Sequence, residues 1–152
     1  MSDFPVFAWL QEQIERWRQR EEKTTFNLHG QIEPNSSVHA NRQWLTRALD
    51  NLVANATRAC QNCAEACVTV DCFVLEGNRI RIEISDNGPG IPDEVRPYLF
   101  IKMLPEDLEG KFGWGIGCLI VQFIARAYGG QASLLRSDAG GTTTAIELPL
   151  VG

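Results

Sequence analysis

Two runs of alternating apolar residues, joined by a short turn, constrain the fold of this chain most strongly. Apolar residues occupy every second position between Cys67 and Leu75, and isoleucine does so between Ile80 and Ile84. A period of two places alternate side chains on one face of a strand. The turn-forming sequence at 76–78 therefore predicts an antiparallel hairpin with one buried face. The residues expected on its buried face are Val68, Val70, Cys72, Val74, Ile80, Ile82 and Ile84.

Two segments show the period of amphipathic helices, which could cover this face. Residues 1–22 include a leading helix whose apolar stripe is Phe7, Leu10, Ile14 and Trp17. From about Asn41 to Cys60 a second helix has a broader apolar face. Its expected core residues are Trp44, Leu45, Ala48, Leu49, Leu52, Val53 and Ala56.

The remaining segments complete an α+β pattern in one domain spanning residues 1–152. A strand is expected in "TTFNLHGQI", and "QASLLRSDAGGTTTAIELPL" predicts a final pair of strands. Residues 92–112 are irregular, contain prolines and one short helix, and are typical of a lid. A further helix follows "GWGIG" and stops at Gly129-Gly130. This order predicts a two-layer sandwich with helices on one face of a sheet. The residues expected to pack the last helix are Leu119, Ile120, Phe123 and Ile124.

Composition excludes several functional classes. The formal net charge is −5 and no segment is rich in Lys or Arg, so nucleic acid is not an expected partner. We find no apolar stretch long enough to cross a bilayer and no signal-peptide pattern. We therefore expect a cytoplasmic location, although a parent protein could still carry a membrane anchor.

Four of the five cysteines lie close together, at Cys60, Cys63, Cys67 and Cys72. Their gaps of two, three and four residues do not match a zinc ribbon or a ferredoxin series. We expect free thiols, with Cys72 pointing into the core, and a metal or redox-sensing site is the alternative.

Three polar residues of the second helix, Asn51, Asn55 and Arg58, project from one stripe that is not the apolar one. Asparagine is unfavourable inside a helix because its amide competes with the backbone. The stripe is either two solvated amides or an amide pair aimed at a ligand, with oxygens suited to a hard cation such as Mg²⁺.

The motif "DNGPG" follows the second hairpin strand. A carboxylate at Asp86 could accept a hydrogen bond from an exocyclic amine, and Gly88 and Gly90 would allow close approach. The same motif is also a good turn sequence without any ligand.

The glycines of "GWGIG" precede a helix, where backbone N–H groups and the positive dipole end favour an anion. They do not follow a strand, so they fail the context of a dinucleotide-binding fingerprint. They also lack the Gly-Lys-Ser/Thr ending of a P-loop.

Taken in order, "LTRALDNLVANATRA", "ISDNGPGIP", "FGWGIGCLIV" and "AGGTTTAIELPL" resemble the N, G1, G2 and G3 boxes of histidine kinases. These kinases form one branch of the superfamily shared with DNA gyrase, the Hsp90 chaperones and the MutL repair proteins. The resemblance covers Phe7 to Leu150. It implies the Bergerat ATP-binding fold, with a mixed and mostly antiparallel sheet, and ATP and Mg²⁺ as cofactors.

For the adenine end, the resemblance implies that Asp86 accepts a hydrogen bond from the adenine amino group. Gly88 and Gly90 would line the purine. The further nucleotide contacts that the resemblance implies are Ile91, Phe100 and Thr142.

For the phosphate end, the resemblance implies that Asn55 is the Mg²⁺ ligand and that Asn51 and Arg58 are phosphate-side contacts. Asn51, Asn55 and Lys111 would be the catalytic residues, with Lys111 reaching the terminal phosphate. The residues that would cradle or cover the phosphates are Gly113, Trp114, Gly115, Ile116 and Gly117.

Asn51 bears on the phosphoryl acceptor. ATPases of the superfamily and the similar serine-directed kinases carry a glutamate four residues before the metal asparagine, where this chain has Asn51. An amide cannot act as a general base, whereas a neutral imidazole already presents a lone pair near pH 7. Asp50 is acidic, but one residue turns it about 100° away. We therefore expect phosphoryl transfer to histidine.

The acceptor itself is not found in the chain. His29 is expected in a strand and His39 just before a helix, and neither resembles a phosphoacceptor motif. The implied partners are a dimerisation and phosphoacceptor domain and a response regulator, with this chain monomeric and the parent protein a homodimer. A nucleotide-binding regulatory module without catalysis and a serine-directed kinase are the alternatives, and Trp114 and the short "YLFIKML" lid favour the former.

Overall fold

The computed structural model describes residues 1–108 and 116–152, and these form two layers, a sheet and a set of helices. The five-stranded sheet has the order β2-β4-β5-β7-β6. Only the β2–β4 pair is parallel, so the sheet is mixed and mostly antiparallel. The strands are β2 (Thr25–Gln31), β4 (Cys67–Leu75), β5 (Arg79–Asp86), β6 (Gln131–Asp138) and β7 (Gly141–Pro149).

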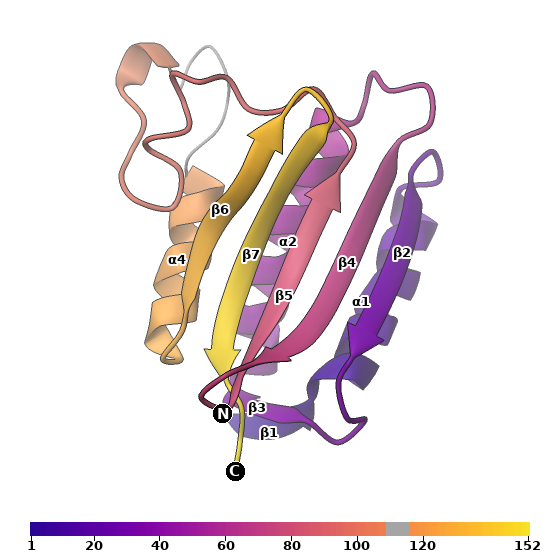
Figure 1. The fold of residues 1–152 in the computed structure, drawn as a ribbon, viewed down its shortest axis with the longest axis vertical. Helices are drawn as coiled ribbons and strands as arrows, with labels where there is room; N and C mark the ends of the chain where they lie inside the picture. The colour runs from indigo at the N-terminus through magenta and orange to yellow at the C-terminus, as the bar shows by residue number, and fades with distance from the viewer. Residues whose placement is uncertain (109–115) are drawn as a thin grey trace.

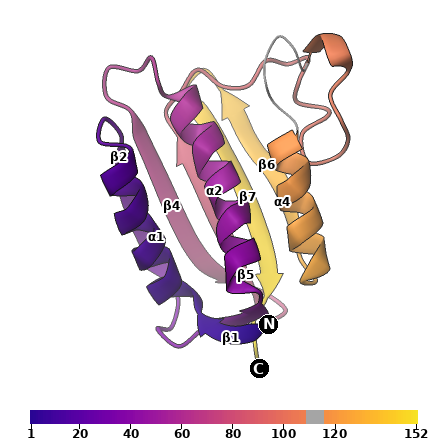
Figure 2. The ribbon, with the colours of Figure 1, turned by 180° about the vertical axis from the view of Figure 1, so that it is seen from behind.

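The helices α1 (Val6–Arg20), α2 (Arg42–Ala59) and α4 (Ile116–Ala127) all cross the same face of this sheet (Figures 1 and 2). The expected α+β sandwich with helices on one face is confirmed. In the described ranges, no helix combines the length and the apolar character that a bilayer crossing needs.

The predicted hairpin is confirmed as β4 and β5. Val70 pairs with Ile84 and Cys72 with Ile82, so the alternating apolar residues meet on the buried face. Gly77 and Asn78 form the turn with φ of 80° and 58°, a backbone region that glycine and asparagine tolerate. The end of β5 is thereby fixed at Asp86.

Helix α2 begins and ends close to the predicted positions. The Asn41 side chain accepts a hydrogen bond from the Trp44 N–H (3.1 Å), and Cys60 is the C-cap. Its buried residues are Leu45, Ala48, Leu49, Leu52, Val53 and Ala56. This helix lies at the centre of the helical layer, between α1 and α4 (Figure 2).

Three predicted core residues are exposed instead. Trp44 is 49%, Val74 46% and Phe123 77% exposed, whereas Leu119 and Ile120 are half-buried and Ile124 is buried. Helix α4 is apolar on most sides, but it lies at the edge of the layer, so only one side of it packs against the sheet and α2. A period alone does not show which apolar side of such a helix is covered.

A small second sheet was not predicted. The strands β1 (Ser2–Pro5) and β3 (Ser37–Ala40) pair antiparallel at one end of the molecule. The leading helix therefore begins at Val6, whose N–H donates to the carbonyl of Ser36 (2.9 Å). Four residues are too few to show a clear alternation, which is why the sequence did not indicate this ribbon.

Candidate functional site

Asp86 lies at the end of β5 and is buried, with 8% of its surface exposed. Its Oδ1 accepts a hydrogen bond from the N–H of Gly88 (2.9 Å). Burial raises the pKa of this carboxyl, and the backbone N–H groups of Gly88 and Thr142 and the Arg136 charge oppose the increase. A buried carboxylate needs partners, because leaving acceptor capacity unused costs free energy. Asp86 is therefore suited to accept a further hydrogen bond from a ligand.

A narrow cavity opens in front of Asp86, between α2, the sheet and the start of α4. Its volume is ≈ 10 Å³. Protein sites for small ligands usually measure about 300–1,000 Å³. A ligand could therefore enter this cavity only if some of the residues that line it moved outward. The described residues that line the cavity are Leu52, Asn55, Ala56, Ile84, Asp86, Ile91, Leu99, Cys118, Thr142 and Thr144.

Four of these lining residues were singled out in the sequence: Asn55, Asp86, Ile91 and Thr142. The structure thus brings together positions from three separate segments of the chain: α2, the end of β5 with the loop that follows it, and β7. Leu52, Ala56 and Ile84 were expected only in the core. Thr144 was not identified, although it pairs with Ile84 and follows Thr142 by two residues, which places both threonines on one face of β7.

The polar stripe of α2 faces the first turn of α4. The guanidinium of Arg58 donates to Asn55 Oδ1 (3.0 Å), and Asn55 Nδ2 lies 3.5 Å from Cys118 Sγ. Asn51 approaches Gly117, where an added Cβ would lie 3.8 Å from Asn51 Oδ1. Asn51 Nδ2 is buried and has no hydrogen-bond partner among the described residues. Such orphaned donors are rare in proteins and mark this flank of α2 as a candidate ligand site.

Asp50 is directed away from this stripe. Its Oδ1 accepts hydrogen bonds from Arg16 Nη2 (2.6 Å) and Trp17 Nε1 (2.8 Å), both on α1. The expected turn of about 100° around the helix is confirmed. Asp50 is thus engaged on the opposite flank of α2 and is not placed to act as a base at the cavity.

Gly88 and Gly90 are required by packing in this structure. A Cβ at Gly88 would lie 2.6 Å from the carbonyl oxygen of Ala59, and one at Gly90 would lie 2.4 Å from that of Asp138. Gly90 also has a φ of 91°, which an L residue rarely adopts. Neither glycine is among the described residues that line the cavity. Their predicted contact with a purine stays a prediction.

The described part of the lid, residues 92–108, closes the outer side of the cavity through Leu99. Phe100 follows it with a φ of 65°, which costs about 1–3 kcal/mol for a bulky residue. The buried Gln122 side chain donates to the Phe100 carbonyl (3.0 Å) and so anchors the lid to α4. Phe100 lines a neighbouring hollow with Leu119 and Gln122 instead of the cavity wall.

Four predicted phosphate contacts, Lys111, Gly113, Trp114 and Gly115, lie outside the described residues. Of the other predicted contacts, Ile116 is half-exposed at the first position of α4 and Gly117 follows it. The described residues therefore contain the predicted adenine side and the α2 part of the predicted phosphate side.

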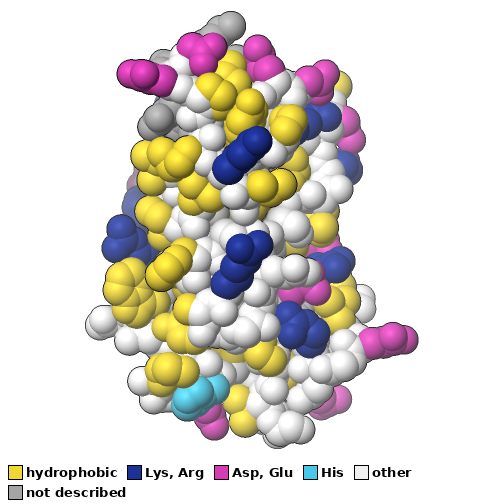
Figure 3. All heavy atoms as spheres, turned by 90° about the vertical axis from the view of Figure 1, so that its left-hand side faces the viewer, with side chains coloured by type: hydrophobic (Ala, Val, Ile, Leu, Met, Phe, Trp, Pro, Cys, Tyr) yellow, Lys and Arg dark blue, Asp and Glu magenta, His cyan; other side chains and the backbone are white. Residues whose placement is uncertain are grey.

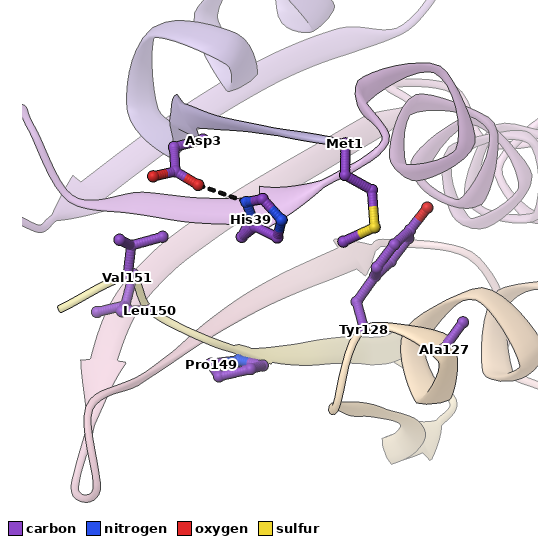
Figure 4. Close-up of a pocket in the computed structure, with 8 residues that line it drawn as sticks. All are labelled: Met1, Asp3, His39, Ala127, Tyr128, Pro149, Leu150 and Val151. Carbon is purple, nitrogen blue, oxygen red and sulfur yellow. Dashed lines mark hydrogen bonds and ion pairs between the residues drawn. The ribbon is translucent and has the colours of Figure 1, made fainter.

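A wider hollow of ≈ 610 Å³ lies near the β1–β3 ribbon (Figure 4). It is lined by Met1, Tyr128 and a His39–Asp3 pair whose Nδ1 and Oδ1 are 2.5 Å apart. Asp3 and His39 are register partners in the ribbon, so the pair joins β1 to β3. None of the predicted site residues lies in its wall, and we assign it no function.

Comparison with known protein families matches the part of the chain that contains the cavity at Asp86. The family described as histidine kinase-, DNA gyrase B-, and HSP90-like ATPase matches residues 40–152. The chain belongs to this family. The matched range begins at the end of β3 and contains α2, the whole of the cavity lining and the last two strands.

A similar sensor protein indicates to which branch of this family the chain belongs. Sensor protein RstB of Escherichia coli K12 is 35% identical over 109 residues, which are 70% of this chain and 24% of RstB. The chain thus spans about a quarter of the length of that relative. Within the family, it is a catalytic and ATP-binding domain of the sensor histidine kinase type.

Solved structures agree on the fold. The mycobacterial sensor histidine kinase MprB superposes with a TM-score of 0.76 and 22% identity, covering 98% of each chain. The ATP-binding domain of PrrB from Mycobacterium tuberculosis has a TM-score of 0.75 and 22% identity, covering 99% of this chain and 98% of its own. At this identity the likeness shows the shared fold.

Proposed function

We propose that this domain binds Mg-ATP in the cavity at Asp86 and transfers the γ-phosphoryl group to a histidine on a separate domain. The observation that carries the proposal is the buried Asp86 carboxylate, which faces a cavity also lined by Asn55 and Thr142. Its acceptor oxygens match the exocyclic amino group of adenine. The family supports the choice of ATP as the ligand.

Asn55 is the residue that would hold Mg²⁺. Amide oxygens are hard ligands, and Mg²⁺ usually takes only one or two protein ligands together with substrate phosphates. Asn55 Oδ1 accepts a hydrogen bond from the Arg58 guanidinium (3.0 Å), so Mg²⁺ would take the second lone pair of this oxygen or displace that contact. When bound, Mg²⁺ supplies charge neutralisation to the phosphates. Asn51 and Arg58 flank Asn55 and would position the phosphate chain.

The choice of histidine as acceptor rests on the stripe of α2 around Asn55, which carries Asn51 and Arg58 but no carboxylate. Asn51 stands one helical turn before Asn55, and its amide cannot remove a proton from water or a hydroxyl group. Asp50 is committed to Arg16 and Trp17. A neutral imidazole needs no such base. A serine-directed kinase is therefore the weaker alternative.

A nucleotide-binding regulatory module without catalysis is the second candidate. Two features of the sequence favour it, Trp114 within "GWGIG" and the short "YLFIKML" lid. Such a module would bind ATP and act through protein contacts alone.

We assign contact with the phosphoacceptor domain to the exposed apolar surface of α4 and the lid (Figure 3). Figure 3 shows hydrophobic side chains on this face with Lys and Arg side chains between them. Phe123 is 77%, Ile101 71% and Met103 53% exposed. Exposed apolar patches of this kind mark interaction sites. The lid also lines the cavity at Asp86 through Leu99, so a partner on this surface would be near the proposed phosphates.

The proposal is tested in two steps. Calorimetry with Mg-ATP should detect binding, and a sensor-kinase domain with an acceptor histidine should then acquire acid-labile, base-stable phosphate. Asn55→Ala should keep adenine binding and lose the Mg²⁺-dependent transfer. Binding without transfer to any acceptor histidine would favour the regulatory module. Hydrolysis of ATP by this chain alone would instead indicate an ATPase.

A further inference from the structure

Cys60 and Cys63 lie in one tight turn at the end of α2. Cys60 is the C-cap of the helix, and the Cys63 N–H donates to the Cys60 carbonyl (2.8 Å). A hydrogen-bonded turn of this kind keeps its first and fourth Cα atoms within about 7 Å. Disulfides join Cα atoms about 4.4–6.8 Å apart. The Cα separation that this turn allows therefore overlaps the range in which a disulfide can form.

Both thiols contact the same residue, Asn87. Cys60 Sγ is 3.2 Å from Asn87 Oδ1, and Cys63 Sγ is 3.4 Å from the Asn87 carbonyl oxygen. Asn87 is otherwise held by the Cys67 N–H (2.9 Å to Oδ1) and by its own donation to the Glu65 carbonyl (2.7 Å). Two of these four contacts are thus made by thiols that oxidation would consume.

The two thiols differ in their access to solvent. Cys63 is half-buried and lines a surface hollow of ≈ 350 Å³ together with Asn87 and Gly88. Cys60 is fully buried, and burial raises the pKa of its thiol. A small oxidant can reach Cys63 through this hollow, and Cys60 then supplies the second sulfur from inside the turn.

We propose that Cys60 and Cys63 form a thiol–disulfide switch that controls the nucleotide site. A peroxide oxidises Cys63 to the sulfenic acid and is itself reduced to water. The Cys60 sulfur then attacks the Cys63 sulfur, an S–S bond forms, and the hydroxyl leaves as water with the Cys60 proton. A dithiol reductant reverses the reaction by exchange.

The switch acts on the loop that follows Asp86, and this inference rests on the proposed function. Gly88 packs on the last turn of α2, where a Cβ would lie 2.6 Å from the Ala59 carbonyl oxygen. Its N–H in turn holds Asp86 Oδ1. A disulfide removes the thiol contacts to Asn87 and pulls the turn that Gly88 touches. The Asp86 carboxylate then loses its alignment, and nucleotide affinity falls by about fivefold or more, the effect of one lost hydrogen bond.

The test uses the whole 152-residue chain, reduced or treated with hydrogen peroxide. Cleavage after Arg58 and Glu65 releases a peptide whose only cysteines are Cys60 and Cys63. We expect this peptide to lose two hydrogen atoms in mass on oxidation. Calorimetry with an ATP analogue should show the weaker binding in the oxidised chain and its recovery with dithiothreitol. Cys63→Ala should abolish the redox response, and the control Cys72→Ala should keep it.

Each outcome has a distinct meaning. A reduced chain that binds no ATP analogue overturns the proposed function and the switch that depends on it. Binding by the reduced chain without an oxidised 60–63 peptide, or with cross-linking to Cys67, overturns the switch alone. A 60–63 disulfide that leaves the affinity unchanged also overturns it, while the proposed function stands.

Discussion

The two flanks of α2 both carry polar groups, but these groups differ in how fully they are hydrogen-bonded. On the flank facing α1, Trp17 Nε1 and Arg16 both donate to Asp50, and Trp9 Nε1 donates to Thr46 Oγ1 (3.0 Å). On the flank facing α4, Asn51 Nδ2 has no partner among the described residues, and Asn55 Nδ2 meets a cysteine sulfur, although Asn55 Oδ1 accepts a hydrogen bond from Arg58.

This difference indicates that one flank of α2 contributes to stability and the other to ligand binding. Buried polar groups that are hydrogen-bonded within the protein add to stability, whereas an unsatisfied one costs about 1–3 kcal/mol. Proteins retain such a cost at sites where a ligand supplies the missing partner. The α1 flank therefore stabilises the domain, and the α4 flank is arranged for a ligand.

The largest effect is expected on the α1 flank. Trp17 is fully buried, so Trp17→Ala should lower the free energy of unfolding by about 3–5 kcal/mol. Urea denaturation measures this loss. Trp44→Ala is the matched control, because Trp44 is half-exposed and should cost less than about 1 kcal/mol. Equal losses in the two variants would contradict the distinction.

Asp86→Asn should weaken ATP binding about tenfold, because charge-assisted hydrogen bonds exceed neutral ones by about 1.5 kcal/mol. The raised pKa of Asp86 means that its stabilising contribution is present at low pH and is lost as the pH rises through that pKa. The variant should therefore be at least as stable as the parent at neutral pH.

Calorimetry and thermal unfolding across a pH series measure both effects. ATP binding by the unchanged protein should also weaken as acid protonates the carboxyl. A loss of stability at neutral pH in the Asp86→Asn variant, with ATP binding retained, would reverse the roles that we give to this residue.

Asn51→Leu replaces the unsatisfied amide with an apolar group of similar size. We expect the free energy of unfolding to rise by about 1 kcal/mol, because a buried donor without a partner is removed. ATP binding should weaken in the same variant. Denaturation and calorimetry on one sample provide the test, and a destabilised variant with normal binding would show that the amide is structural.

The smallest effect on stability is expected at the exposed surface of α4. Phe123→Ser should change the free energy of unfolding by no more than about 0.5 kcal/mol, since the side chain is largely exposed. Phosphoryl transfer to an acceptor domain should nevertheless fall. The neighbouring Ile124→Ala should cost about 2–5 kcal/mol, because Ile124 is buried. Unchanged transfer by Phe123→Ser would remove this surface from the proposed interface.

The sequence predicted the elements with strong periods. The α2 boundaries and the β4–β5 register follow from Asn41, from the alternation of Val70 and Cys72, and from the turn at Gly77. The predicted burial was wrong for side chains whose exposure depends on which neighbouring elements pack against them. Trp44 and Phe123 fit the helical period, yet the described part of the chain leaves them 49% and 77% exposed. The short β1–β3 ribbon had too few residues to give a signal.

The sequence predicted those residues of the candidate site that belong to recognisable motifs. Asn55, Thr142 and the motif that contains Asp86 and Ile91 meet in one cavity, although these three segments are far apart in the sequence. Leu99 and Cys118 also line it and were not predicted as contacts. Both are apolar residues in segments whose position depends on the lid and on the start of α4, so only the folded arrangement places them beside Asp86.

The small volume between Leu99 and Asp86 has a consequence for measured affinity. ATP can enter only those molecules in which the wall has already moved outward or is displaced by the ligand. If such open conformers make up about one molecule in a hundred, the apparent dissociation constant is about a hundredfold weaker than the intrinsic one. A substitution at Phe100 or Gln122 could then tighten nucleotide binding without touching the nucleotide, simply by enlarging the open population.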